Sequence, residues 1–200
     1  MDENLCRENV EKVVVRAAEL NNFVRIDMEN SPYTDATLRI LTSLRKKYEN
    51  VGVVIQAYLF RSEKDIENLI AMNTRVRLCK GAYKEPPDIS FAKKEDTDSN
   101  FIKLMKILVK SGIYHGIATH DPNMIEATKQ FVRQEGIGSE KFEFQMLYGI
   151  RRDLQDQLIR EGYGVRIYVP YGAEWYSYLM RRMAERPANL MFVLRNLVRS

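Results

Sequence analysis

Several side chains that could do chemistry stand near the ends of short apolar runs in this 200-residue chain. Lys80 follows the run VRLC, where a lysine could form a Schiff base with a carbonyl substrate, although no obvious activating group stands beside it. His115 and His120 are the only histidines, and Cys6 and Cys79 are far apart in the sequence. Because these residues form no cluster with metal-ligand spacing, we expect no metal site.

A second candidate group is the adjacent pair Arg181 and Arg182, in the segment WYSYLMRRMAERPANL. If this segment is helical, Tyr178 and Glu185 fall on the same stripe as the pair. Such a stripe is most often a solvated helix face, and Glu185 at position i+4 could simply pair with Arg181. It becomes a binding surface only if the helix covers a site, so both interpretations remain open.

The composition is that of an ordinary globular chain, with 45% hydrophobic and 29% charged residues, and one domain over 1–200 is expected. No apolar run approaches the roughly 20 residues of a membrane helix, and the acidic start MDENLCRENV does not resemble a secretory signal. With only two separated cysteines, we expect a reducing, cytoplasmic setting. The net charge of +4 is mild and its basic residues are interspersed with acidic ones, so we expect no nucleic-acid partner.

Short runs of β-branched and apolar residues alternate with longer helix-patterned stretches, after a first helix expected at about 2–22. Six strand-then-helix units in a row predict a parallel α/β sheet. Several expected helices begin with a capping residue or an early proline, and several end at a glycine. The longest irregular stretch is 84–100. The predicted strands are 23–28, 51–59, 75–83, 114–120, 142–149 and 164–172; the caps are Ser31-Pro32, Ser62, Ser99 or Asn100 and Asp121-Pro122; the ending glycines are Gly112, Gly136 and Gly162.

Polar residues gather at the carboxyl ends of these predicted strands, as in a (β/α)8 barrel of the TIM type, where the active site is built from strand ends. No GxGxxG follows the first strand, so nothing indicates a dinucleotide-binding Rossmann domain. A full barrel has eight units in about 250 residues. The chain is therefore predicted to hold the last six units, with the first two strands missing. The strand-end residues are Asp27, Gln56, Lys80, Tyr83, His120, Tyr148 and Tyr168.

The motifs RIDMEN, VVIQAYL, VRLCKGAY, IATHD, EFQMLYG, VRIYVPYG and YLMRRMAERPAN follow one another along the chain. In this order and spacing the chain resembles proline dehydrogenase, an FAD-dependent barrel enzyme, in its monofunctional bacterial form. The resemblance covers essentially all 200 residues, and the combination of VRLxKGAY with YxxRR is specific.

The resemblance implies that the last helix covers the carboxyl end of the barrel and that its arginine pair binds the carboxylate of proline. Guanidinium groups suit this role because they are forked donors that stay charged. Tyr168 is implied to pack at the proline ring and, with Arg77, to serve catalysis. Tyr178 favours proline over hydroxyproline. The implied substrate-binding residues are Arg181, Arg182, Tyr178, Tyr168, Leu147, Tyr83 and Asp27.

For the cofactor, the resemblance implies an arginine near flavin N5, a glutamine at the flavin ring, the KGAY motif against the flavin, and a histidine contact. From the residues alone, a glutamine or aspartate at a strand end is more often structural, and Arg77 could face outward. The implied cofactor-binding residues are Gln56, Arg77, Lys80, Gly81, Ala82, His120 and Glu185.

The implied reaction is hydride transfer from L-proline to flavin N5, giving Δ1-pyrroline-5-carboxylate, with the electrons passed to a quinone. A quinone acceptor makes peripheral contact with the inner face of the membrane an expectation for this cytoplasmic chain.

The chain departs from the family in lacking the first two strands, the second of which carries a lysine that holds the substrate carboxylate. Six units would leave two open sheet edges, which invite pairing with a partner chain or self-association. Two functions therefore stay open at this point. The chain is either a proline-oxidising flavoenzyme, or its larger portion, or it is a non-catalytic remnant that acts as a binding module.

Overall fold

The computed structural model describes residues 2–172. The chain divides into two compact units, Met1–Arg166 and Ile167–Ser200. Among the described residues, no helix is both long and apolar enough to span a membrane.

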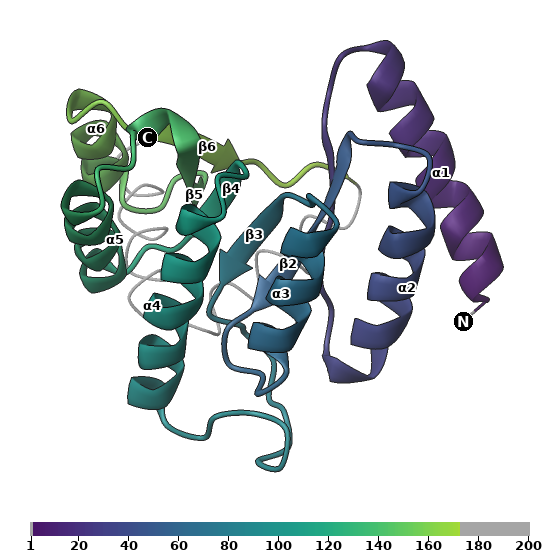
Figure 1. Ribbon diagram of the computed structural model, residues 1–200, viewed down its shortest axis with the longest axis horizontal. Coiled ribbons are helices and arrows are strands. Elements are labelled where there is room, and N and C mark those ends of the chain that lie inside the picture. The colour runs from purple at the N-terminus through teal and green to yellow at the C-terminus, as the bar shows by residue number, and fades with distance from the viewer. Residues whose placement is uncertain (1, 173–200) are drawn as a thin grey trace, which may run out of the picture. The chain divides into compact units, whose positions relative to one another are not determined.

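One sheet of six parallel strands organises the described chain (Figure 1). The strand order is the order of the sequence, so each strand lies beside the one that precedes it in the chain. This arrangement confirms the predicted succession of strand-then-helix units and the α/β class. The strands are β1 (Val24–Ile26), β2 (Val51–Gln56), β3 (Val76–Cys79), β4 (His115–Ala118), β5 (Phe142–Leu147) and β6 (Gly164–Tyr168).

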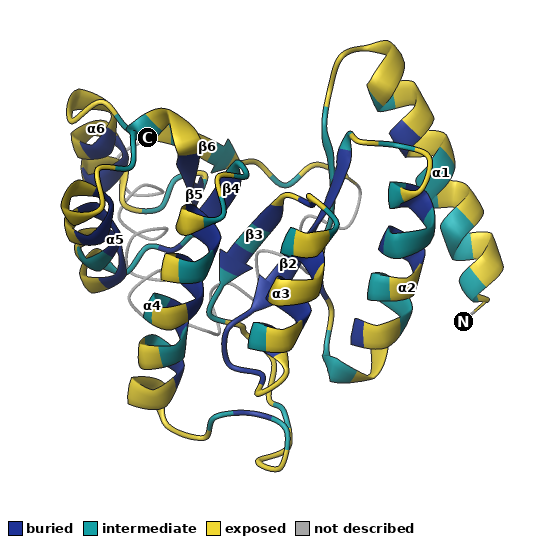
Figure 2. Cartoon of the chain, in the orientation of Figure 1, coloured by how far each residue is buried: buried dark blue, intermediate teal, exposed yellow. Residues whose placement is uncertain are grey.

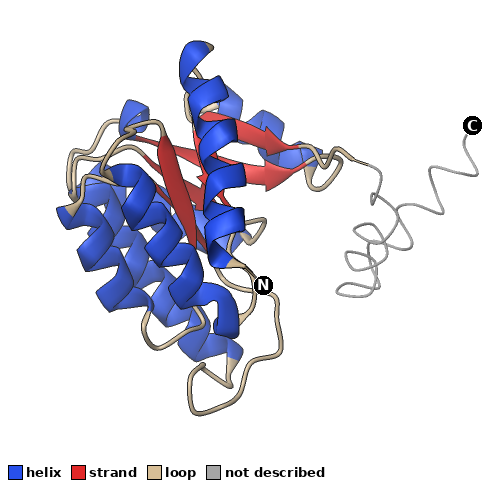
Figure 3. Cartoon of the chain, turned by 90° about the vertical axis from the view of Figure 1, so that its right-hand side faces the viewer, coloured by secondary structure: helices blue, strands red, loops and turns tan. Residues whose placement is uncertain are grey.

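Helices connect the strands and cover one face of the sheet (Figures 1 and 3). α2 and α3 contact β2, α4 contacts β3 and β4, and α5 packs on α4. The helices are α1 (Glu3–Glu19), α2 (Thr34–Arg45), α3 (Ser62–Ala71), α4 (Lys94–Lys110), α5 (Pro122–Gln134) and α6 (Arg152–Arg160), with short 3-10 turns at η1 (Ser31–Tyr33) and η2 (Ser139–Lys141).

The core lies between the sheet and these helices, as the buried inner sides of the helices in Figure 2 show. Side chains alternate between the two faces of a strand. In β3, Val76 and Leu78 are fully buried toward the core, whereas the alternate residues Arg77 and Cys79 are only partly buried. This strand therefore places apolar residues toward the helices and leaves Arg77 on the opposite face.

Several predicted helix boundaries are confirmed. The Asp121 side chain accepts a hydrogen bond of 3.0 Å from the Asn123 amide, and Pro122 is the first residue of α5. Gly112, Gly136 and Gly162 each adopt a positive φ directly after the C-cap of α4, α5 and α6, as expected of glycine at this position.

Other boundaries correct the sequence prediction. α4 begins at Lys94 rather than near Ser99, because KKEDTDSN consists of residues tolerated in a helix and places Glu95 and Asp96 in the first turn. The irregular stretch predicted at 84–100 therefore ends at 93. Ser62 is the first helical residue of α3 rather than its cap, and its hydroxyl donates to the Gln56 carbonyl at 2.5 Å.

His115 is a structural residue that faces the core. Its Nδ1 accepts a 3.0 Å hydrogen bond from the Val76 amide, so the proton of the neutral ring lies on Nε2, 2.9 Å from the Ser111 hydroxyl oxygen. Burial, followed by the charge of Arg25, lowers the pKa of His115 to about 4. The ring is therefore neutral across the physiological range.

This lowered pKa predicts acid sensitivity. Between pH 6.5 and about 4 the unfolded chain binds a proton at His115 that the folded chain does not. The contribution of His115 to the free energy of unfolding is therefore fully present above pH 6.5 and is lost as the pH falls toward 4. We expect the free energy of unfolding to fall by on the order of 3 kcal/mol more in the parent chain than in H115N over this range. Urea unfolding of both proteins at pH 7 and pH 4.5 measures the difference, and equal losses would refute the assignment.

Candidate active site

Most of the predicted site residues stand at one edge of the sheet, because parallel strands all end at the same edge. Asp27 follows β1, Gln56 ends β2, Lys80 follows β3 and Leu147 ends β5. His120 follows β4 by two residues. The register pairs Val54 with Arg77 and Gln56 with Cys79. Arg77 and Gln56 therefore share the sheet face that is opposite the helices.

Arg77 and Asp27, from β3 and the end of β1, form an ion pair. The Arg77 Nη2 atom lies 2.6 Å from Asp27 Oδ1, and the two side chains are 19% and 46% exposed. The guanidinium is thus held at the strand ends, with one edge on a carboxylate that still reaches solvent. This arrangement fixes the Arg77 guanidinium at the strand ends, on the sheet face opposite the helices.

Gln56 is buried, with 4% of its surface exposed. Its Nε2 lies 3.5 Å from the Met28 carbonyl, and its Oε1 lies 3.5 Å from the Tyr58 hydroxyl, both at the outer limit of a hydrogen bond. A buried amide normally makes closer bonds. The Gln56 amide therefore retains capacity for a nearer partner at the strand ends.

Gly81, in the KGAY motif, is required by two features of the backbone. Its φ is +112°, and a Cβ at this position would lie 1.8 Å from the Tyr58 ring. Only glycine can adopt this conformation and allow the ring to pack against the main chain. The KGAY loop is thus pressed onto Tyr58, next to Gln56. Ala82, which follows, is exposed.

Lys80 lies in a network of charges that joins β3 to two helices. Its ammonium pairs with Asp98 of α4, and it lies 2.7 Å from Oδ2 of Asp121, whose other oxygen caps α5. Burial raises the pKa of both carboxyl groups, but hydrogen bonds, those from Lys80 first, outweigh burial and leave each pKa below its usual value. Lys94 also pairs with Asp98, at 2.5 Å. The Lys80 ammonium is therefore committed to two aspartates, which disfavours a Schiff-base role.

Replacing Lys80 with methionine should lower the free energy of unfolding by about 2 kcal/mol, because two partly buried aspartates lose their shared cation. The matched control is K103M, which removes the exposed pair of Lys103 with Glu63 and should cost about 0.5 kcal/mol or less. Urea denaturation at pH 7 measures both. Equal costs for the two variants would contradict this account of the network.

His120 and Leu147 are brought together by a hydrogen bond of 2.8 Å from the Leu147 amide to His120 Nε2. A neutral His120 therefore carries its proton on Nδ1. The bond fixes the ring orientation and ties the end of β4 to the end of β5.

Tyr83 lies at the same edge, and its hydroxyl donates to Glu29 Oε2 at 2.5 Å. Its side chain is 41% exposed. Glu29 was not singled out from the sequence, although it belongs to the RIDMEN motif. This contact joins the loop after β1 to the loop after β3.

Deeper on the same sheet face, Glu143 gathers several donors. It accepts from Arg166 and Gln145 at 2.6 Å and from Tyr114 at 3.0 Å. Burial raises the pKa of Glu143, but these bonds, that of Arg166 first, lower it below its ordinary value. Arg25 stands near this cluster, and burial followed by the charge of other arginines lowers its pKa to about 10.

The remaining predictions are placed as follows. Tyr168 is the last residue of β6, belongs to the second unit and is 36% exposed. Tyr178, Arg181, Arg182 and Glu185 lie outside the described residues. Within residues 2–172 no group of three His, Cys, Asp or Glu side chains could hold a metal ion.

Sequence reasoning missed several residues that hold this edge together. The sequence pattern indicates Asp121 only as a helix cap and places Asp98 in the irregular stretch 84–100. Glu85, which receives three hydrogen bonds at this edge, stands in KEPP, between the KGAY motif and α4. An acid directly after a strand-end motif was the only signal in the sequence.

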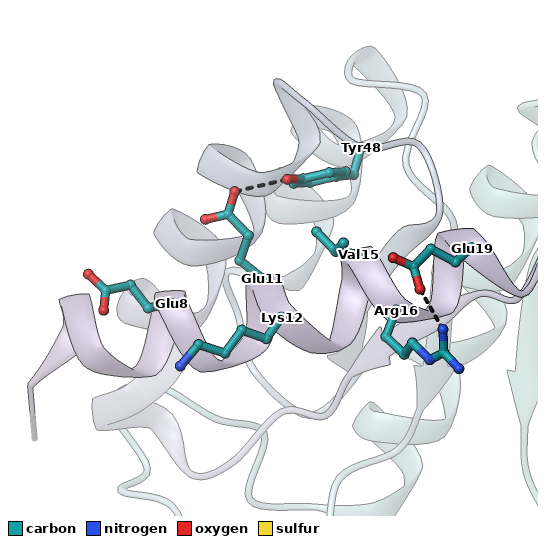
Figure 4. A pocket seen from close by; sticks show the side chains of 7 residues that line it. All are labelled: Glu8, Glu11, Lys12, Val15, Arg16, Glu19 and Tyr48. Carbon is teal, nitrogen blue, oxygen red and sulfur yellow. Dashed lines mark hydrogen bonds and ion pairs between the residues drawn. The ribbon is translucent and has the colours of Figure 1, made fainter.

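The pocket drawn in Figure 4 lies along α1 and contains none of the predicted site residues. Its charged groups pair with one another or with neighbouring polar groups: Arg16 lies 2.6 Å from Glu19, and Tyr48 donates to Glu11 at 3.1 Å. These pairings give no indication that this pocket is a catalytic site. Its lining residues are Glu8, Glu11, Lys12, Val15, Arg16, Glu19 and Tyr48.

Several known proteins of similar sequence are named proline dehydrogenases. Proline dehydrogenase 2 of Bacillus subtilis is 46% identical over 199 residues, covering 100% of this chain and 66% of that protein. Proline dehydrogenase of Deinococcus radiodurans is 43% identical over 199 residues, covering 98% of this chain and 64% of that protein. The chain thus spans just under two thirds of the length of these relatives.

A solved structure agrees with the fold. Proline utilization A from Bdellovibrio bacteriovorus, inactivated by N-propargylglycine, superposes with a TM-score of 0.85 at 29% identity. The match covers 90% of this chain and 22% of that chain. The proline dehydrogenase domains of such proteins have a TIM-barrel-type fold, which confirms the predicted fold class.

The family model described as proline dehydrogenase matches residues 3–195, nearly the whole chain, and so includes every strand end described above. The motifs that carried the resemblance lie within this match. The chain therefore belongs to the proline dehydrogenase family.

Proposed function

We propose that the chain carries the FAD-binding and much of the proline-binding surface of a proline dehydrogenase, which oxidises L-proline to Δ1-pyrroline-5-carboxylate in proline catabolism. When bound, FAD would supply the hydride acceptor for the ring carbon next to the proline nitrogen. The observation that carries the proposal is the pairing of Arg77 with Asp27 beside the buried Gln56, on one sheet face.

The donor set at this edge fits a flavin ring. Gln56 offers a buried amide with two contacts of 3.5 Å, so it can donate to and accept from a planar ring of alternating polar atoms. Arg77 offers a guanidinium oriented by Asp27. A positive charge at this place would stabilise the negative charge that develops as a hydride is accepted.

The neighbouring residues position the cofactor. Gly81 and Ala82 would line the ring through the main chain of the KGAY loop, which is pressed onto Tyr58. His120, oriented by the Leu147 amide, would contribute a further contact. Because the ammonium of Lys80 is paired with two aspartates, Lys80 contributes its stem and main chain rather than its charge. Glu185 completes the proposed cofactor contacts.

The substrate is oriented by its carboxylate and by its ring. Arg181 and Arg182 bind the carboxylate, since paired guanidinium groups match its two oxygens. By binding the carboxylate, this pair would hold the reacting carbon of proline in a fixed orientation toward the cofactor. By the family resemblance, Leu147, Tyr168 and Tyr178 would contact the proline ring, and Tyr83 would lie near the substrate. Asp27 would act through Arg77, and Arg77 and Tyr168 would serve catalysis.

Electrons must leave the cofactor after each turnover, and we include a quinone as the acceptor. A quinone lies in the membrane, so the proposal includes a cytoplasmic chain that contacts the inner face of the membrane peripherally. The net charge of +4 is compatible with an anionic lipid surface. Self-association or a partner chain at the sheet edges, through β1 or β6, is part of the same proposal.

The test is a visible absorption spectrum of the purified chain with added FAD, before and after anaerobic addition of L-proline. We expect protein-bound flavin bands that bleach with L-proline and do not bleach with L-alanine, which has the same carboxylate and amine but no ring. Flavin that binds without bleaching would place the defect on the substrate side. A chain that binds no flavin would refute the proposal and favour a non-catalytic binding module.

A further inference from the structure

Glu85 is the most heavily hydrogen-bonded acid of the loop between β3 and α4. Its Oε1 accepts from the Ser31 amide at 2.8 Å and from the Tyr58 hydroxyl at 3.2 Å, and its Oε2 accepts from the Ser31 hydroxyl at 2.5 Å. Glu85 is partly buried, whereas Lys84 and Pro86 on either side of it are exposed. These contacts join the loops that follow β1, β2 and β3.

Tyr58 links Glu85 to Gln56, the residue at the end of β2 that is proposed to contact the cofactor. Its hydroxyl oxygen lies 3.2 Å from Glu85 Oε1 and 3.5 Å from Gln56 Oε1. A tyrosine hydroxyl has one proton, so it can donate to only one of these two acceptors. The ring itself is fixed, because it is 7% exposed and packs against Gly81.

The charges decide which acceptor takes the proton. Burial raises the pKa of Glu85, but the two bonds from Ser31 and the bond from Tyr58 outweigh burial, so its pKa is below the ordinary value. Burial, followed by the charge of Glu85, raises the pKa of Tyr58. An ionised carboxylate is a stronger acceptor than a neutral amide and here lies closer. The Tyr58 proton therefore lies on the Glu85 side.

We propose that Glu85 is a positioning residue that holds the Tyr58 proton away from Gln56, so that the Gln56 carbonyl stays available to a ring N–H donor of the cofactor. This inference rests on the proposed function, since it assigns Gln56 to the flavin. Without Glu85 the Tyr58 hydroxyl turns to Gln56 and competes with the cofactor.

The experiment is a titration of the full chain with FAD, followed by flavin fluorescence and by the position of the visible absorption bands. We expect E85A to raise the Kd for FAD at least tenfold and to shift the bands. E85Q keeps a carbonyl acceptor for Tyr58 and should bind FAD within threefold of the parent chain. D88A, an exposed acid in the same loop, is the matched control and should bind within twofold.

The most discriminating measurement is the FAD affinity of the double variant E85A/Y58F. If the competing hydroxyl causes the loss, Y58F should restore FAD affinity in the E85A background to within threefold of Y58F alone. A purely structural role of Glu85 predicts no such rescue. A double variant as weak as E85A would overturn the inference, as would an E85A chain that binds FAD like the parent.

Y58F also tests the inference if E85A does not fold, which circular dichroism would reveal. With the hydroxyl gone and the ring kept, FAD should bind at least as tightly as to the parent chain. A tenfold loss in Y58F would overturn the inference, because the hydroxyl would then be needed for binding. A parent chain that binds no FAD overturns the proposed function together with this inference, whereas failure of the variant pattern overturns the inference alone.

Discussion

Under the proposed function, replacing Arg77 with methionine is expected to lower kcat/KM for L-proline about 100-fold or more, because it removes the fixed positive charge at the strand ends. The guanidinium is held 2.6 Å from Asp27 and therefore needs no reorganisation during the reaction. Asp27 is 46% exposed, so its carboxylate can be solvated once its partner is lost. We therefore expect little change in the folded state, and a steady-state assay with a quinone acceptor measures the loss.

The matched control is R75M, at an arginine two residues earlier in the chain, just before β3 begins. Arg75 points to the same sheet face but lies over the rings of Phe23 and Tyr114, away from the strand ends. We expect R75M to retain kcat/KM within about threefold. Equal losses in the two variants would assign the effect to the sheet as a whole. Full activity in R77M would show that the reaction does not need Arg77.

Replacing Gly81 with alanine is expected to destabilise the chain by about 3 kcal/mol or more. Two costs add at this position. The φ of +112° is strained for alanine, and the new Cβ would stand 1.8 Å from the Tyr58 ring. For a chain of this length such a change lowers the melting temperature by roughly 10 °C, which differential scanning calorimetry can measure. Affinity for FAD should fall with it, because the KGAY loop can no longer rest on Tyr58.

G112A separates these two costs. Gly112 also has a positive φ, of +77°, but nothing lies within 4 Å of the added Cβ. We expect G112A to cost about 1 kcal/mol, the conformational part alone. The smaller ring-free side chain in Y58L should recover part of the stability lost in G81A. If G81A were as mild as G112A, the close approach of Tyr58 to the loop would be wrong.

The sequence pattern predicts all six strands, because β-branched and apolar residues are dense in each of them. It predicts strands that are longer than the observed ones. The run 75–83 was expected to be one strand, but β3 ends at Cys79, since Gly81 leaves the extended conformation. Pattern reasoning cannot detect such an end, because Ala82 and Tyr83 are also compatible with a strand.

The site is predicted in part. Strand ends can be located from a sequence, and this places Asp27, Gln56 and Lys80 at one edge. Their partners cannot be located in this way. Glu85 meets Ser31 across 54 positions and Tyr58 across 27, and these contacts arise only when the loops fold over the same edge. Lys80 illustrates the same limit, because its two aspartates are set by the packing of α4 and α5.

The strand order of the sheet bears on how the chain is made. Each strand pairs with the strand translated just before it, so a new unit finds its place on structure that has already left the ribosome. No early strand must wait for a distant one, which keeps the loop-closure cost of each step small. The segment with Arg181 and Arg182 is translated after all six of these strands. Under the proposed function, the newly made protein would therefore assemble the strand-end part of its cofactor site before it acquires the arginine pair that holds the substrate carboxylate.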